Sequence, residues 1–152
     1  MTWDVEIVPQ VHDWLQDLGR YDPTALAAVS AALDLLGRDG PGVGPPLART
    51  LASMPAMHAG LELLRDYDPG FQFSVDNAER LMAMTYLREL RPSSSGVRDP
   101  RLLFAFDQDR TAVVVAAGAE VSDWANWYSE SVPLAHTRYI QYLRERTEDG
   151  NA

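Results

Sequence analysis

The sequence predicts an α+β fold, in which an N-terminal strand and a helical hairpin pack on a small antiparallel sheet and a C-terminal helix completes the domain. Two short apolar runs, 102–106 and 111–116, flank a polar turn, which is the pattern of a β-hairpin. Residues 86–91 form a third strand candidate, so the sheet is predicted to contain an antiparallel meander. The chain of 152 residues is long enough for a single domain over residues 1–152 with its own core.

The N-terminal part predicts a strand followed by two helices. Residues 3–8 alternate apolar and acidic side chains, which is the period of a half-buried strand. Apolar residues then recur at helical spacing as far as Gly19, the predicted stop. A second helix is predicted to begin at Asp22-Pro23, because aspartate can cap a helix and proline fits its first position, and to end near Gly37.

A glycine- and proline-rich stretch at 38–46 predicts a loop that delivers Leu47 to the core. A phosphate-binding loop is disfavoured there, because prolines lack amide donors and no Lys-Ser or Lys-Thr pair follows.

An insert at about 54–84 carries short helical, turn and strand patterns, so it is predicted to be ordered. Acidic side chains outnumber basic ones in it. Two interpretations are open. The insert covers the arginines of the sheet or forms a partner surface, or it is a solvated elaboration of the sheet edge.

The C-terminal part predicts two helices. Asp123 can cap a helix that carries Trp124 and Trp127 on one face. Pro133 is predicted to start a separate final helix, and the polar residues 145–152 are predicted to fray.

The composition argues against several classes of site. Cysteine is absent, which excludes disulfides and thiol catalysis, and no two histidines stand at ligand spacing, so neither a metal nor a cofactor is expected. No signal pattern or membrane-length apolar run is present, so a cytoplasmic protein without membrane contact is predicted. The net charge of -9 gives a poor overall field for nucleic acid, so any basic function must be local.

Several motifs carry a resemblance when they are taken in order. They are LRELRP, RLLFAFD with an arginine three residues on, AAG, and WANWY followed by PLAHTRYIQYL. Together they resemble the phage-derived HigB-like branch of the RelE/ParE toxin superfamily, closely over residues 86–143 and loosely over 2–51. The resemblance implies a type II toxin that cleaves mRNA in the ribosomal A site without a metal. It also implies a helix-turn-helix antitoxin as the partner, in a toxin–antitoxin hetero-oligomer.

The candidate site residues are mostly arginines. Cleavage of RNA by its own 2′-hydroxyl needs cations that stabilise charge on the phosphorane, and the arginine fork matches phosphate oxygens. The resemblance implies catalytic roles for three side chains: Arg88, Arg91 and Arg101. The candidates for substrate binding are Arg98, Arg110 and, by stacking on a base, Tyr128.

A rival interpretation is open for the same residues. The arginines can instead form structural ion pairs, with Glu89, Asp99 and Asp107 as their partners. Two departures from the family pattern favour the rival: the acidic insert is extra, and Glu120 stands where the family has a lysine. The alternative function is therefore a catalytically impaired interaction module that binds a protein partner through the insert.

Overall fold

The computed structural model describes residues 2–51, 86–92, 99–119 and 121–150. The predicted insert at 54–84 lies outside these ranges, as do the candidate residue Arg98 and the departure at Glu120.

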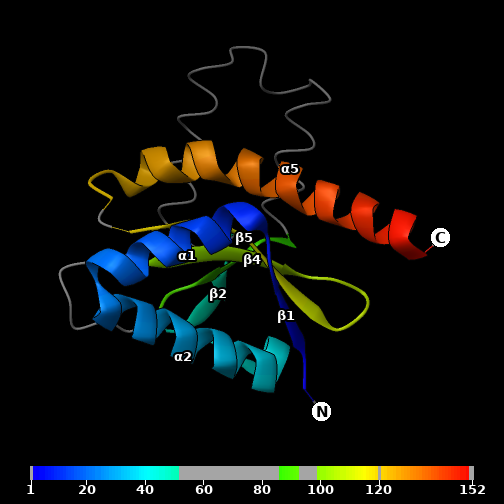
Figure 1. Cartoon of the computed structure of the whole chain (residues 1–152), viewed down its shortest axis with the longest axis horizontal. Coiled ribbons are helices and arrows are strands. Elements are labelled where there is room, and N and C mark those ends of the chain that lie inside the picture. Colours follow the sequence, from blue (N-terminus) through cyan, green and yellow to red (C-terminus); the bar gives the residue numbers. More distant parts are fainter. Residues whose placement is uncertain (1, 52–85, 93–98, 120, 151–152) are drawn as a thin grey trace.

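One five-stranded sheet forms the centre of the molecule, with the strand order β1-β5-β4-β3-β2 (Figure 1). The strands are β1 (Asp4–Ile7), β2 (Ala48–Thr50), β3 (Arg88–Leu90), β4 (Arg101–Phe106) and β5 (Thr111–Gly118). Strands β3, β4 and β5 form the predicted antiparallel meander, and β2 pairs antiparallel with β3. The predicted α+β fold is confirmed.

The pairing of β1 corrects one part of that prediction, because β1 runs parallel to β5 and the sheet is therefore mixed. Asp4 is opposite Thr111, and Ile7 is opposite Val114. Parallel neighbours need a long crossover connection, which the helices and the remaining strands supply. An alternating pattern shows which face of a strand is buried but not the direction of its neighbour, so this pairing could not be read from the sequence.

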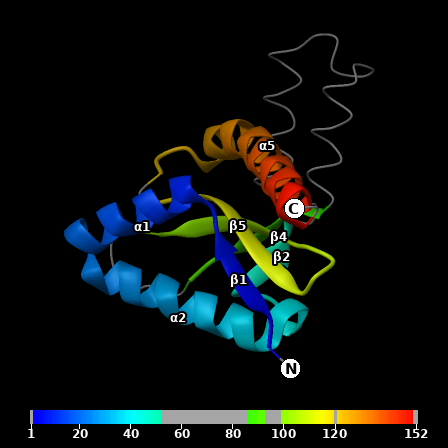
Figure 2. The ribbon, with the colours of Figure 1, turned by 45° about the vertical axis from the view of Figure 1, so that its right-hand side comes forward.

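Helices cover both faces of the sheet. Helices α1 (Pro9–Tyr21) and α2 (Pro23–Asp39) form the predicted hairpin on one side, and α5 (Trp124–Gly150) lies over the other (Figures 1 and 2). Asp22 caps α2 as predicted, since its Oδ1 accepts a 3.0 Å hydrogen bond from the amide of Ala25. Across the described ranges, no helix combines the length with the hydrophobicity that a membrane span requires.

Both helices of the hairpin run past the glycines that were predicted to end them. Gly19 lies inside α1, where a Cβ atom would come within 2.8 Å of Leu26 Cδ2. Gly37 lies inside α2, where a Cβ atom would be 3.4 Å from the carbonyl oxygen of Trp3. These glycines allow neighbouring segments to pack closely against the helices, and they do not end them. The sequence alone does not distinguish a glycine that ends a helix from one that allows close packing.

The C-terminal helix α5 is continuous, which corrects the prediction of two helices. Pro133 lies inside α5, where it removes one backbone hydrogen bond. Val132 and Ala135, on either side of the proline, are fully buried in the core. This packing holds both halves of the helix in line.

The far end of α5 is tied to the turn between β4 and β5 by an aspartate. Arg146 and Tyr142 donate hydrogen bonds of 3.0 and 3.2 Å to Oδ2 of Asp107. The other oxygen of Asp107 accepts a hydrogen bond from the backbone amide of Thr111. The stretch 145–150, which was predicted to fray, is therefore a helical part of the fold.

Strands β4 and β5 form the centre of the core, because nearly all their side chains are buried on both faces. At the end of β5, Gly118 leaves no room for a side chain: a Cβ atom would lie 2.5 Å from Nε1 of Trp127. This glycine therefore fixes how closely α5 approaches the sheet.

Replacing Gly118 by alanine is expected to lower the free energy of unfolding by about 1–3 kcal/mol, because the methyl group displaces the indole of Trp127. Gly44→Ala is the matched control, since no atom of the described residues lies within 4 Å of a Cβ atom there. The control is expected to stay within about 0.5 kcal/mol of the wild type. Urea denaturation measures both variants, and equal stabilities would contradict the close approach.

Candidate functional site

Two of the predicted arginines, Arg91 and Arg101, lie around one buried acid on the face of β3 that α5 covers. Glu89 is fully buried, and Arg49 on β2 is opposite it in the sheet. Leu103 on β4 is opposite Glu89 on the other side, and Arg101, two residues earlier on β4, lies on the same face. We call the group Glu89, Arg49, Arg91, Arg101 and Tyr128 the Glu89 cluster.

A directed chain of hydrogen bonds runs through the Glu89 cluster. Arg101 Nη1 donates to the Tyr128 hydroxyl over 2.9 Å, and that hydroxyl donates to Oε2 of Glu89. Arg101 Nη2 also lies 3.3 Å from Oδ2 of Asp99, and its guanidinium lies 3.9 Å from the ring centre of Trp124. Arg101 and Tyr128 are almost completely buried. The chain joins β3, β4 and α5 through polar groups.

Arg91, like Arg49, is a partly exposed member of the cluster. Its Nε lies 3.7 Å from Oε1 of Glu89, and its side chain is 31% exposed against 8% for that of Arg101. Among the described residues, the buried Nε atoms of Arg49, Arg91 and Arg101 and the Oε1 atom of Glu89 have no hydrogen-bond partner. The cluster therefore keeps unused donors beside a partly open arginine.

Burial sets the protonation of the cluster. Loss of water raises the pKa of Glu89 to about 7, although Arg101, Arg91 and Arg49 each lower it. Burial also lowers the pKa of Arg101, but arginine starts so far above neutrality that it stays charged. Glu89 is thus a buried acid that changes its charge near neutral pH.

The other predicted side chains lie elsewhere. Arg88 precedes Glu89 on the strand and so faces the opposite side of the sheet, where its Cζ lies 5.2 Å from the ring centre of Phe106. Phe106 contacts Trp3 edge to face, and Arg110 Cζ lies 4.8 Å from the Trp3 ring. The structure therefore separates Arg88 and Arg110 from the Glu89 cluster.

The predicted structural ion pairs are present in part. Arg91 pairs with Glu89, and Arg101 pairs with Asp99. Asp107 pairs with Arg146 on α5, an arginine that the sequence analysis did not consider.

Two features of this region were missed from the sequence. Glu89 was treated as a possible ion-pair partner and not as the centre of the site, although the period of two in LRELR places it on the same face as Arg91. Tyr86 and His136 were not paired, yet the Tyr86 hydroxyl lies 2.6 Å from Nδ1 of His136. Burial raises the pKa of Tyr86. No sequence pattern joins these two residues, because α5 brings them together.

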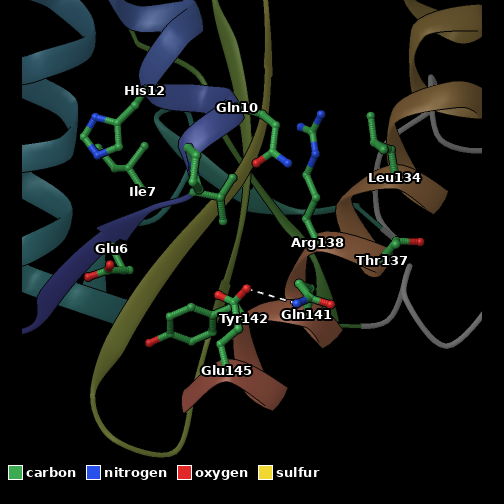
Figure 3. Close-up of a pocket in the computed structure, with 12 residues that line it drawn as sticks. Glu6, Ile7, Gln10, His12, Leu134, Thr137, Arg138, Gln141, Tyr142 and Glu145 are labelled. Atoms are coloured by element: carbon green, nitrogen blue, oxygen red, sulfur yellow. Dashed lines mark hydrogen bonds between the residues drawn. The ribbon is translucent and has the colours of Figure 1, made fainter. Parts of the chain in front are cut away.

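A hollow of about 670 Å³ lies between the β1–α1 junction and α5, and none of the predicted site residues lines it (Figure 3). Arg138 reaches from α5 towards the start of α1, and its Nη1 donates a 2.9 Å hydrogen bond to the carbonyl oxygen of Val115. Burial lowers the pKa of Arg138. Within the described residues, no three His, Asp or Glu side chains come together as a metal site would require.

Two curated relatives from Mycobacterium tuberculosis (strain H37Rv) are similar to this chain over most of its length. "Putative toxin HigB3" is 28% identical over 141 residues, which are 91% of this chain and 92% of that protein. "Putative toxin HigB2" is 29% identical over 144 residues, which are 95% of this chain. The chain is similar to both of these HigB proteins. Its predicted resemblance is thereby confirmed.

The HigB-like chain spans 55% of the length of the relative named HigB2 and nearly all of the relative named HigB3. No protein-family model matches it, and no solved structure matches it.

Glu89 is expected to make stability fall as pH rises. Its pKa in the folded protein is about 7 against an ordinary value of 4.5, so between these values the folded state binds more protons than the unfolded state. Relative to the wild type, Glu89→Gln is therefore expected to gain stability from pH 5 to pH 8, by on the order of 3 kcal/mol.

Urea denaturation of wild type and Glu89→Gln at pH 5, 6, 7 and 8 measures this difference. Glu6→Gln, an exposed carboxyl on β1, is the matched control and is expected to keep the wild-type slope. A Glu89→Gln variant whose stability runs parallel to the wild type at all four pH values would show that Glu89 does not titrate in this range.

Proposed function

We propose that this HigB-like protein is the toxin of a type II toxin–antitoxin pair and that it cleaves mRNA as an endoribonuclease. The observation that carries the proposal is the Glu89 cluster, in which three arginines converge and two of them, Arg49 and Arg91, are partly exposed. The proposed substrate is ribosome-bound mRNA, and the proposed partner is a helix-turn-helix antitoxin that forms a hetero-oligomer with the toxin.

The charge of the cluster supports an anionic ligand. Three arginines stand against two acids, Glu89 and Asp99, so the cluster is positive even though the chain as a whole is acidic. Protonation of Glu89 adds one further positive charge. A phosphate group matches this local field, and arginine can bind it with two parallel hydrogen bonds.

The exposure of the arginines divides their proposed roles. Arg91 makes the phosphate contact, because its guanidinium is partly open to solvent. Arg101 and Tyr128 lie behind it, and their direct contact with substrate stays a prediction since both are covered in this arrangement. The roles of Arg88, Arg98 and Arg110 also stay predictions.

The proposed chemistry needs no metal at the phosphate. Attack of the ribose 2′-hydroxyl on the neighbouring phosphorus builds negative charge on the phosphorane oxygens. A guanidinium that is already in place stabilises that charge more in the transition state than in the substrate. Arg91, whose Nε pairs with the buried Glu89, is the residue proposed for this task.

Induced expression of the wild type in a bacterial host is expected to arrest growth and to create new 5′ ends in cellular mRNA. Arg91→Gln is expected to lower cleavage at least tenfold, which corresponds to about 1.4 kcal/mol of transition-state stabilisation. The matched control is Arg20→Gln, because Arg20 is a strongly exposed arginine on α1 that pairs with a neighbouring exposed aspartate. Mapping of mRNA 5′ ends provides the measurement.

Two outcomes would contradict the proposal in different ways. Soluble, folded wild type that causes neither arrest nor new 5′ ends would refute the endoribonuclease. Cleavage that is equal in the wild type and in Arg91→Gln would move the site away from the Glu89 cluster.

A further inference from the structure

We propose that Glu89 is the positioning residue of the site: its buried carboxylate aims the guanidinium of Arg91 at the RNA phosphate. The inference rests on the proposed endoribonuclease function, and it assigns to the buried acid a task that the reaction itself does not require. Glu89 does not touch the substrate, since it is fully buried. It acts through Arg91.

The hydrogen bonds of Glu89 leave one oxygen for this task. Oε2 accepts from the hydroxyl of Tyr128, and that hydroxyl is itself fixed by a donor from Arg101. Oε1 has no hydrogen-bond partner among the described residues, and it faces Nε of Arg91 at 3.7 Å. Tyr128 therefore fixes the Oε2 side of the carboxylate, and the other oxygen, Oε1, faces Arg91.

Arg91 needs such a restraint because, apart from the pairing with Glu89, the contacts among the described residues fix only its backbone. Its amide donates a 2.7 Å hydrogen bond to the carbonyl oxygen of Leu47, which holds the residue at the end of β3. The side chain beyond Cβ has several rotatable bonds and loses conformational entropy when it is ordered. The ion pair between its Nε and Glu89 restrains the side chain in the free protein, so part of that entropy is lost before substrate arrives.

The charges around Glu89 give the positioning a pH dependence. The groups that face it are Arg49 from β2, Arg91 directly after β3, Arg101 from the start of β4 with the preceding Asp99, and Tyr128 from α5. The arginines stay charged at neutral pH, and burial brings the pKa of Glu89 to about 7. The hold on Arg91 is therefore stronger at pH 8 than at pH 6.

The kinetic test compares purified wild type, Glu89→Gln, Glu89→Asp, Arg91→Gln and the Glu89→Gln/Arg91→Gln double variant on ribosome-bound mRNA at pH 6, 7 and 8. At pH 8, Glu89→Gln is expected to lower kcat about tenfold and to change KM less than about threefold, because orientation and not binding is lost. Glu89→Asp keeps the charge and is expected to retain the pH dependence, with an intermediate rate. The wild-type advantage over Glu89→Gln is expected to shrink as pH falls to 6.

The double variant separates positioning from general damage. If Glu89 acts through Arg91, Glu89→Gln has no further effect once Arg91 is glutamine. An equal loss of activity in both backgrounds would overturn the proposal. Thermal unfolding of each variant, with Arg20→Gln as the control, shows whether the compared proteins are folded.

A measurement without RNA keeps the two proposals distinguishable. In the NMR spectrum of the free protein, the Nε–H resonance of Arg91 is expected to shift between pH 6 and 8 in the wild type and to stay constant in Glu89→Gln. An Arg91 Nε–H resonance that changes neither with pH nor with the substitution would overturn the positioning role even in an active enzyme. Wild type that shows the shift but does not cleave mRNA would support the positioning of Arg91 and refute the proposed function.

Discussion

Burial of the Glu89 carboxylate beneath α5 is the constraint on which the rest of the structure depends. A carboxylate without water costs several kcal/mol unless donors and cations surround it. Tyr128 and three arginines supply that surrounding, and each comes from a different place in the chain. The need to satisfy one acid therefore fixes the relative positions of β2, β3, β4 and the first turns of α5.

The far end of α5 is also anchored to the sheet through a carboxylate. There the acid, Asp107, belongs to the sheet's hairpin turn, and α5 supplies the donors Tyr142 and Arg146. Between the two polar anchors, α5 contacts the sheet through apolar groups such as Val132 and Ala135. A proline in this middle part is tolerated because neither anchor depends on the backbone hydrogen bond that it removes.

Much of the fold was predictable because local patterns decide it. The polar turn between two apolar runs identifies β4 and β5, and the pair Asp22-Pro23 identifies the start of α2 through capping chemistry. Pairings between distant segments were not predictable in the same way. The parallel direction of β1 and the continuity of α5 across Pro133 are set by tertiary packing, which a local pattern does not record.

The candidate site was predictable in its residue types but not in its geometry. The motif LRELR marks a strand rich in arginine, and its alternation separates Arg88 from Arg91 across the sheet. That Glu89 lies at the centre could not be inferred without the position of Tyr128, which arrives from α5. The burial that perturbs Glu89 also lowers the stability of the fold at high pH, which is a typical cost of a functional site.

The parallel pairing of β1 with β5 has a consequence for how the protein is made. Asp4 is synthesised before its partner Thr111, and Glu89 is synthesised before the Tyr128 hydroxyl that donates to it. Contacts of such long sequence separation form late in folding. The nascent chain therefore holds β1 without its neighbour and Glu89 without this donor until β5 and the start of α5 have been synthesised, so the arginine site is completed only after that point.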